Sequence, residues 1–409
     1  MLRRSAMVRA ALAAVALVVL APLTACDPAP PESVTLRGHG FGHGRGMGQW
    51  GALGYAVDHG WSGTQILDHY YGGTTSQTAP AAGDQRVYLT ESKGRELVVT
   101  QTAGRLRVDG YDSDVAAVRI ARLGAGRFRI YRGTGCTGPW TLVGDRTSSE
   151  VSVRSSVLQG NDPTRMMQHC VSGQTLYYRG SMRAVDALGT IVAVNQVAIE
   201  AMLRSIIPKE VSPSWADAGG GRGGSAVRAQ AVAARSYALA GDGRWGTWAT
   251  TCDSSTCQAY AGYGRRTTGS STIVRNEDLR TDVAVSATTG VVRTFASGRI
   301  ARTEFATSSG GWTSPGDFPA VVDDGDDYAG NSHHSWSVVL TRARIESAFD
   351  ARQGRDMGTF LGFDSWVRNG LGDMGGRVTS MRARFSDGDV ILTGEQVRIL
   401  FSLKSNWFG

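Results

Sequence analysis

The feature that most limits the fold of this chain is a change of hydrophobic period near residue 198. Between residues 86 and 197, short β-branched and aromatic runs such as Arg127–Tyr131 and Thr190–Val197 lie between Gly and Asp turns. Their period of two is typical of half-buried strands, whereas the segments after residue 198 have helical spacing. The sequence therefore predicts an α+β fold with a β-rich subdomain over residues 86–197.

Two helices are expected directly after the β-rich subdomain. The amphipathic run Ala198–Ile207 is predicted to stop at Pro208, because proline lacks the N–H that a helix interior needs. The alanine-rich run Ser225–Ala240 has a first serine suited to cap its start and Gly241 suited to end it. Between the two helices, Gly219–Gly224 is interpreted as a flexible insertion. Further helices are predicted at residues 49–58, 64–70, 277–288 and 394–400, and further strands at 34–37, 378–385 and 390–393.

The N-terminus has the composition of an export signal. Residues 1–25 carry three arginines, no acidic residue and an apolar stretch of the right length. Residues 23–26 (LTAC) resemble the lipobox of bacterial lipoproteins, so we expect lipidation at Cys26 and a Pro-rich tether over residues 26–33. The alternative is ordinary cleavage near Ala25, which would release a secreted protein. Either way the mature protein is expected outside the cytoplasm.

Charge and hydropathy exclude several classes of protein. Three of the positive charges in the net +7 belong to residues 1–25, and the remaining excess is too small to indicate a nucleic-acid partner. A hydrophobic content of 41% is too high for a disordered chain. No later apolar stretch reaches the roughly 18 residues of a membrane span. We therefore expect a globular protein that reaches the membrane only through its lipid.

The cysteines indicate disulfides. Five is an odd number, but assigning Cys26 to lipid leaves four cysteines in an exported chain, enough for two bridges. The most local scheme pairs Cys136 with Cys170 and Cys252 with Cys257, although four cysteines allow three pairings. Zinc at Cys252 and Cys257 is the less favoured alternative, because no histidine lies near them in the sequence.

The common cofactor and metal motifs are missing. The chain has no G-x-x-x-x-G-K-[ST], no H-E-x-x-H and no G-x-S-x-G. Gly46, Gly48 and Gly51 match the G-x-G-x-x-G dinucleotide pattern, but no apolar strand precedes them. Residues 323–327 (DDGDD) miss the EF-hand spacing, so a solvated acidic turn is expected there. We predict neither a cofactor nor a bound metal.

Glycines alternate with other residues from position 38 to position 48, around His39 and His43. In an extended chain both imidazoles would lie on one face and the glycines on the other, where a backbone or a ligand could approach closely. Three interpretations stay open: a tightly packed strand with hydrogen-bonded histidines, a substrate contact, or a metal site.

A single glutamate is the leading candidate for acid–base chemistry. Glu210 follows the predicted end of a helix, next to a lysine, and such a glutamate is usually a solvated surface charge. Its apolar neighbours Ile207, Val211 and Trp215 could instead raise its pKa by desolvation, as a general acid requires.

Other polar side chains are candidate substrate ligands. Gln230, Arg235 and Tyr237 are set among alanines on the predicted helix 225–240, where they are either members of a buried network or ligands in a cleft. Ser308 and Ser309, in the Gly-rich segment ATSSGGWT, are suited either to bind a polar substrate or to form a plain turn.

Three segments together resemble the SpoIID/LytB family of bacterial cell-wall proteins, the stage II sporulation protein D and amidase-enhancer group. Residues 206–215 (IIPKEVSPSW) with 229–239 (AQAVAARSYAL) resemble its V-P-x-E-M-P and K-A-Q-A-V-A-A-R-T-Y patterns. Residues 38–52 (GHGFGHGRGMGQWGA) resemble its G-H-G-x-G-M-S-Q-Y-G-A segment, and residues 306–313 resemble its S-S-S-G-G-x-T segment.

This resemblance implies a SpoIID-like core that acts on peptidoglycan. Members of the family are lytic transglycosylases that cleave glycan strands, or enhancers of a partner amidase, and the family's catalytic glutamate falls on Glu210. One carboxyl group suffices: it protonates the glycosidic oxygen, the sugar's own 6-hydroxyl attacks, and a 1,6-anhydro end forms. A hydrolase usually needs a second carboxylate, and none is obvious in the sequence. We expect the following residues to bind saccharide or support the site: Gln230, Arg235, Tyr237, His39, His43, Gln49, Ser308 and Ser309.

The chain departs from the family pattern in three places. The Gly/His segment precedes Glu210 instead of following it, so residues 34–74 of a permuted domain are expected to pack beside a catalytic core over residues 198–409. Residues 219–224 are inserted between Glu210 and the next helix. Some members hold zinc near the position of Cys257, where the adjacent threonine favours a disulfide in this chain.

The sequence therefore predicts a membrane-tethered lytic transglycosylase that serves the bacterial cell wall in growth or in sporulation. The rival interpretation is a non-catalytic module that binds peptidoglycan and activates an N-acetylmuramoyl-L-alanine amidase. A third, a sugar-binding lipoprotein for transport, would show a bilobal α/β pattern that the short strands do not match.

Overall fold

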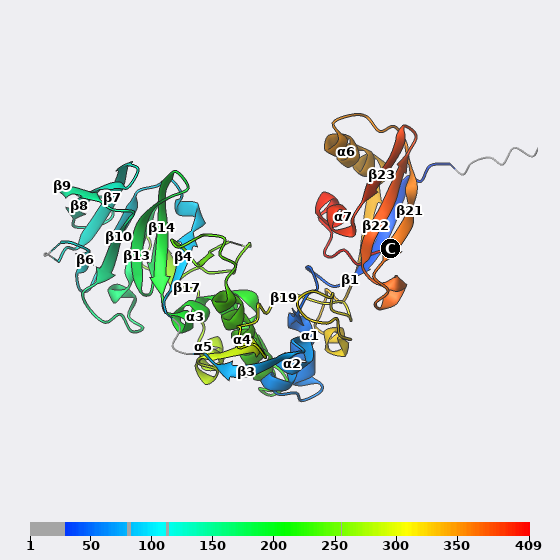
Figure 1. Cartoon of the computed structure of the whole chain (residues 1–409), viewed down its shortest axis with the longest axis horizontal. Helices are drawn as coiled ribbons and strands as arrows, with labels where there is room; N and C mark the ends of the chain where they lie inside the picture. Colours follow the sequence, from blue (N-terminus) through cyan, green and yellow to red (C-terminus); the bar gives the residue numbers. More distant parts are fainter. Residues whose placement is uncertain (1–28, 80–82, 112–113, 255) are drawn as a thin grey trace, which may run out of the picture.

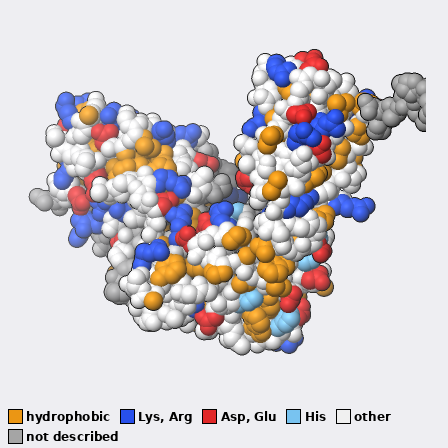
Figure 2. Space-filling view, turned by 45° about the vertical axis from the view of Figure 1, so that its right-hand side comes forward, with side chains coloured by type: hydrophobic (Ala, Val, Ile, Leu, Met, Phe, Trp, Pro, Cys, Tyr) orange, Lys and Arg blue, Asp and Glu red, His pale blue; other side chains and the backbone are white. Residues whose placement is uncertain are grey.

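The computed structural model describes residues 29–79, 83–111, 114–254 and 256–409, and the predicted leader and Cys26 lie outside these ranges. The α+β prediction is confirmed, with helices α1–α5 at the base and one β-rich part on each side of them (Figure 1). In the space-filling view the two β-rich parts rise on either side of a hollow (Figure 2). Among the described residues, no helix is both long and apolar enough to cross a membrane.

Two sheets form the first β-rich part, in the strand orders β15-β4-β14-β13-β10-β6 and β17-β16-β12-β11-β5-β7-β8-β9. Their apolar faces share one core, and the predicted period of two is visible in β8, where Phe128 and Ile130 are buried between more exposed arginines. The strands of this part are β4 (Gln85–Leu89), β5 (Leu97–Thr100), β6 (Leu106–Val108), β7 (Ala117–Gly124), β8 (Arg127–Gly133), β9 (Thr141–Thr147), β10 (Glu150–Ser155), β11 (Met167–Val171), β12 (Gln174–Tyr178), β13 (Ser181–Ala187), β14 (Thr190–Val197), β15 (Thr251–Cys252), β16 (Gly264–Thr267) and β17 (Val274–Arg275).

Helix α4 (Gly224–Ala240) lies at the centre of the base, in contact with all four of the other base helices. Its small side chains let these neighbours approach closely, and most of its residues are buried. Gly241 ends it as predicted, but Gly223 occupies the start and Ser225 makes no capping bond, which corrects that expectation. The other base helices are α1 (Gln49–Val57), α2 (Gly63–Tyr70), α3 (Ile199–Glu210) and α5 (Leu279–Ala287), and the 3-10 turn η3 (Pro213–Asp217) follows α3.

Helix α3 runs through Pro208 instead of stopping before it, so the predicted helix end is wrong. A proline this close to a C-terminus removes one backbone hydrogen bond, and the last turn is still closed by the Val211 N–H, which donates to the Ile207 carbonyl at 3.0 Å. Glu210 is consequently the last residue of the helix and is held in a defined direction.

The N-terminal segment is threaded through the later part of the chain by three strand pairs. Strand β1 (Ser33–His39) pairs with β20 (Ser335–Thr341), β2 (Met47–Gly48) with β19 (Phe305–Ala306), and β3 (Thr74–Thr78) with β18 (Val291–Phe295). Helices α1 and α2, which lie between these strands, pack on α4.

The glycine–histidine stretch is not an extended strand with one glycine face, which corrects the sequence interpretation. Gly40, Gly42, Gly44 and Gly46 all have positive φ, between 68° and 102°, a conformation that other residues rarely adopt. The chain therefore winds after β1, and the two histidines point to different surroundings. His39 packs against Trp407, with ring centroids 5.1 Å apart, whereas His43 lies in a cavity at the base.

The predicted range 198–409 contains two parts in the structure. Residues 335–409 join β1 around a separate hydrophobic core that includes Leu36, Phe349, Phe385 and Phe408. The elements of this second β-rich part are β20, α6 (Arg342–Gln353), β21 (Phe360–Arg368), β22 (Val378–Phe385), β23 (Gly388–Leu392) and α7 (Gly394–Phe401).

Both expected disulfides are present. Cys136 is bonded to Cys170 and Cys252 to Cys257, so the most local pairing scheme is confirmed.

Candidate functional site

A cavity of about 420 Å³ lies where the ends of several base elements meet. It opens between the C-terminus of α3, the N-terminus of α1, one face of α4 and the strand β19. Its lining residues come from five separate stretches of the chain: His43, Arg45, Gln49, Glu210, Tyr237, Thr256, Cys257, Gln258, Ala259, Glu304, Phe305, Ala306 and Thr307. Four residues predicted from the sequence, His43, Gln49, Glu210 and Tyr237, are thus brought together.

Glu210 is partly buried in the wall of this cavity. Burial raises the pKa of its carboxyl above the ordinary value, and the backbone N–H of Ala259, which donates to Oε1 at 3.3 Å, and the nearby Gln49 amide offset part of this rise. The negative end of the α3 dipole also lies at this residue and disfavours a carboxylate. The site therefore keeps Glu210 protonated to higher pH than a surface glutamate, as a general acid needs.

Gln49 connects Glu210 to the centre of the base. As the first residue of α1 it is 5% exposed, and its Nε2 donates to Oε1 of Gln230 at 3.5 Å. Gln230 is 1% exposed in the middle of α4 and does not line the cavity. Gln230 thus holds the Gln49 amide in place beside Glu210. This is a supporting role, because Gln230 itself does not reach the cavity.

An ion pair that the sequence did not predict forms another part of the cavity wall. Arg45 donates from Nε and Nη2 to the two carboxylate oxygens of Glu304, at 2.7 and 2.9 Å. This pairing lowers the pKa of Glu304, so the second carboxylate of the cavity is a weak base. The two residues are 259 positions apart, and although Arg45 lies in the Gly/His segment, no local pattern pairs it with Glu304.

His43 lies beside this ion pair. Its Nδ1 accepts a hydrogen bond from the backbone N–H of Arg45 at 3.0 Å. Burial and the neighbouring arginine lower the pKa of His43 to about 4, so the ring is neutral at pH 7.

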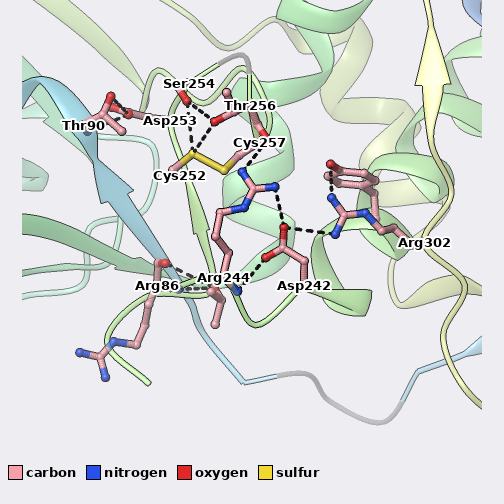
Figure 3. Close-up of a disulfide and its surroundings, with 12 residues drawn as sticks. Arg86, Thr90, Asp242, Arg244, Cys252, Asp253, Ser254, Thr256, Cys257 and Arg302 are labelled. Carbon is pink, nitrogen blue, oxygen red and sulfur yellow. Dashed lines mark hydrogen bonds and ion pairs between the residues drawn. A yellow bond between two sulfur atoms is a disulfide. The ribbon is translucent and has the colours of Figure 1, made fainter. Parts of the chain in front are cut away.

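Tyr237 projects from α4 into another part of the wall. Arg302 donates from Nη2 to the Tyr237 hydroxyl oxygen at 2.7 Å, and its guanidinium lies 4.5 Å from the ring centroid. Asp242 holds Arg302 from the other side and also pairs with Arg244, as Figure 3 shows.

The Cys252–Cys257 disulfide, drawn in Figure 3, restrains a further part of the cavity wall, to which Thr256 and Cys257 contribute. Arg244 donates to the carbonyl of Thr256, and the chain continues from Cys257 to Ala259, whose N–H contacts Glu210. The disulfide therefore restrains the segment that supplies this donor.

Arg235 does not reach the cavity. Its side chain is 0% exposed and pairs with Glu200 of α3, with Nη2 to Oε2 at 2.7 Å and Nε to Oε1 at 2.8 Å. It also donates to the backbone carbonyl of Val291 at 3.1 Å. The structure places it in the buried network that the sequence left open as an alternative to a cleft ligand.

Ser308 and Ser309 also lie outside the cavity lining, and their partner is the acidic cluster. The Asp326 carboxylate accepts from the Ser308 hydroxyl at 2.8 Å and from the N–H groups of Ser309 and Gly310 at 3.1 and 2.9 Å. His334 contacts the same carboxylate at 3.0 Å and packs edge-on against His39. The expected solvated acidic turn is wrong for this residue, because the loop needs a buried acceptor for its donors.

Asp323 is buried in the same region. It accepts a hydrogen bond from the Tyr70 hydroxyl at 2.7 Å, beside the N-terminus of α1, and its second oxygen has no hydrogen-bond partner among the residues that the structure describes. Burial, with a further contribution from Asp326, raises the pKa of Asp323 to about 7.

This burial predicts an unusual dependence of stability on pH. Between about pH 4 and pH 7 the folded protein holds a proton on Asp323 that the unfolded chain releases, so stability falls as pH rises through that window. The full effect corresponds to about 4 kcal/mol. Asp323→Asn keeps an acceptor for Tyr70 and should flatten the profile, so that the variant gains stability relative to wild type at pH 8 but not at pH 4. Asp58→Asn, at an exposed aspartate after α1, is the control, and parallel unfolding profiles for wild type and Asp323→Asn would contradict the expectation.

Comparison with known proteins supports the resemblance. Residues 187–295 match the family model described as SpoIID, stage II sporulation protein. An uncharacterized protein of Brachyspira hyodysenteriae is 37% identical over 62 residues, which is 15% of this chain and 15% of that protein. No solved structure matches the chain.

The matched range contains Glu210, Gln230, Tyr237 and the Cys252–Cys257 disulfide, whereas His43, Arg45, Gln49 and Glu304 lie outside it. The family is linked to sporulation and to hydrolysis of peptidoglycan. Residues 187–295 are therefore similar to a SpoIID domain, which is described as a stage II sporulation protein domain.

Proposed function

We propose that the protein cleaves the glycan strands of peptidoglycan by lytic transglycosylation, with Glu210 as the single acid and base. The observation that supports this most strongly is the position of Glu210 in a cavity wall, where burial raises the pKa of its carboxyl and the Ala259 N–H and the Gln49 amide contact it. On this proposal the predicted leader and the lipid at Cys26 bring the domain to the cell wall from the outer face of the membrane.

In the first step the Glu210 carboxyl donates its proton to the glycosidic oxygen, and the bond between that oxygen and C1 breaks. The oxygen leaves as the hydroxyl of the departing chain. In the second step the 6-hydroxyl of the same sugar bonds to C1 and gives its proton to the Glu210 carboxylate. The product carries a 1,6-anhydro ring, no water is consumed, and Glu210 is restored to its acid form.

The state of Glu304, the other carboxylate in the cavity lining, favours this reaction over hydrolysis. A hydrolase would use a second carboxylate to activate water or to attack C1. Arg45 occupies both oxygens of Glu304 and lowers its pKa, which makes it a poor base and a poor nucleophile. The 6-hydroxyl belongs to the same sugar as C1, so its attack does not require a second carboxylate to position or activate a water molecule.

The test is to incubate purified sacculi with the protein and identify the soluble fragments by mass spectrometry. We expect muropeptides with 1,6-anhydro ends to accumulate with time. If the protein bound sacculi and accelerated an added amidase but released no fragment alone, the proposal would fail and the amidase-enhancer interpretation would replace it.

A further inference from the structure

His43 and Tyr237 both line the cavity, and the hydrogen bonds that they already accept leave each of them a proton to donate to a ligand. Because the Nδ1 of His43 accepts from the Arg45 N–H at 3.0 Å, a neutral His43 ring carries its proton on Nε2. That nitrogen has no hydrogen-bond partner among the described residues and is not sealed from solvent, and the ring lines the cavity. His43 therefore offers the cavity an N–H and not a lone pair.

The hydroxyl of Tyr237 is also left as a hydrogen-bond donor. Arginine can only donate, so the bond of 2.7 Å from Arg302 uses a lone pair of the Tyr237 oxygen. The hydroxyl proton of Tyr237 is left for an acceptor, and the ring lines both the cavity and the adjoining recess at Arg302. Asp242 keeps Arg302 in place, so this polarity does not depend on a free rotation of the arginine.

The charged residues near His43 and Tyr237 also favour a ligand that accepts hydrogen bonds. Arg45 lines the cavity with His43, and Arg302 lines the adjoining recess with Tyr237; each arginine is paired with a carboxylate, Glu304 or Asp242. The carboxylates nearest these two donors, on Glu304 and Asp242, are thus already paired with arginine. A ligand oxygen that accepts hydrogen bonds suits the two donors, whereas an ammonium group would leave them unpaired and would enter a cavity lined by the Arg45 guanidinium.

We propose that His43 and Tyr237 select N-acetylated glycan by donating to its acetamido carbonyl oxygens, and that strands with free amino groups are rejected. This inference rests on the proposed function, because it assigns the cavity to the sugar chain on which Glu210 acts. De-N-acetylation replaces a carbonyl acceptor by a cationic donor, so the wall loses its partner and gains a repulsion.

The experiment uses one preparation of glycan strands divided into three pools: untreated, de-N-acetylated, and de-N-acetylated then chemically re-acetylated. Wild type should cleave the untreated pool at least about tenfold faster than the de-N-acetylated pool, and re-acetylation should restore the rate. Tyr237→Phe and His43→Leu should lower the rate on the acetylated pools and narrow the preference. His43→Gln, which returns an N–H near the position of Nε2, should recover part of it.

Binding of the same pools to Glu210→Gln separates the two proposals. Preferential binding of the acetylated pools without cleavage of any pool by wild type would sink the transglycosylase proposal and leave the selectivity intact. Equal cleavage of all three pools, or a loss in Tyr237→Phe and His43→Leu that is the same on every pool, would overturn the selectivity.

Discussion

Replacing Glu210 by glutamine should stop the release of anhydro-muropeptides, with a fall in rate of at least about 1000-fold. The amide keeps the shape of the side chain but has no proton of suitable acidity for the glycosidic oxygen and cannot take the proton of the 6-hydroxyl. The Ala259 N–H and the Gln49 amide can still bond to the glutamine oxygen, so the cavity should remain formed. The measurement is the initial rate of fragment release from sacculi, by mass spectrometry.

Lys209→Gln is the matched control, because Lys209 precedes Glu210 in the same helical turn, is exposed and does not line the cavity. It should leave the rate close to that of wild type. A thermal unfolding curve for Glu210→Gln like that of wild type would show that the fold is intact. A folded Glu210→Gln that releases fragments at the wild-type rate would remove Glu210 from the mechanism.

Replacing Arg235 by glutamine should destabilise the protein severely. The guanidinium is fully buried and pairs with Glu200, which also accepts from the Gly290 N–H at 3.0 Å. Removing the guanidinium leaves the Val291 carbonyl and the partly exposed Glu200 carboxylate without this donor, which costs about 3 kcal/mol. For a unit of this size that corresponds to a fall of roughly 10 °C in the unfolding midpoint. Differential scanning calorimetry measures it directly.

Arg228→Gln is the control on the same helix, since Arg228 is partly exposed and its side chain makes one hydrogen bond among the described residues, to Ser225. Its unfolding midpoint should stay within a few degrees of wild type. If Arg235→Gln unfolded like wild type but lost affinity for glycan, Arg235 would be a ligand, as one sequence interpretation allowed, and not a structural partner of Glu200.

Much of the base could be predicted from local patterns. Helices α1, α2, α4 and α5 lie close to the ranges that periodicity predicts, because their small and apolar residues pack against neighbouring elements. The rule that proline ends a helix predicts too short an α3, because Pro208 lies in the last turn of the helix, where one missing N–H costs little.

The Arg45–Glu304 pair in the cavity wall could not be predicted from local patterns. Arg45 and Glu304 come from irregular segments, and their pairing depends on how the N-terminal segment threads past β19. The positive φ values of Gly42, Gly44 and Gly46 turn His43 and Arg45 toward that strand, and a side chain at Gly46 would collide with the backbone of Glu304. Alternating glycines in a sequence do not specify which of them turn.

Buried charge was the other feature hidden from the sequence. The run DDGDD has the composition of a solvated turn, yet Asp323 and Asp326 are both buried. Asp326 is needed there because the Ser308–Gly310 turn directs several donors to one point, and that convergence is set by tertiary structure.

The end group of the released glycan is the most direct test of the whole account. High-resolution mass spectrometry distinguishes a 1,6-anhydro end from a reducing end, which is heavier by one water, and digestion in water enriched in oxygen-18 labels only the hydrolytic product. We predict anhydro ends without label. Reducing ends that carry the label would show that water is the nucleophile, and Glu304, despite its pairing with Arg45, would then have to be assigned a catalytic role.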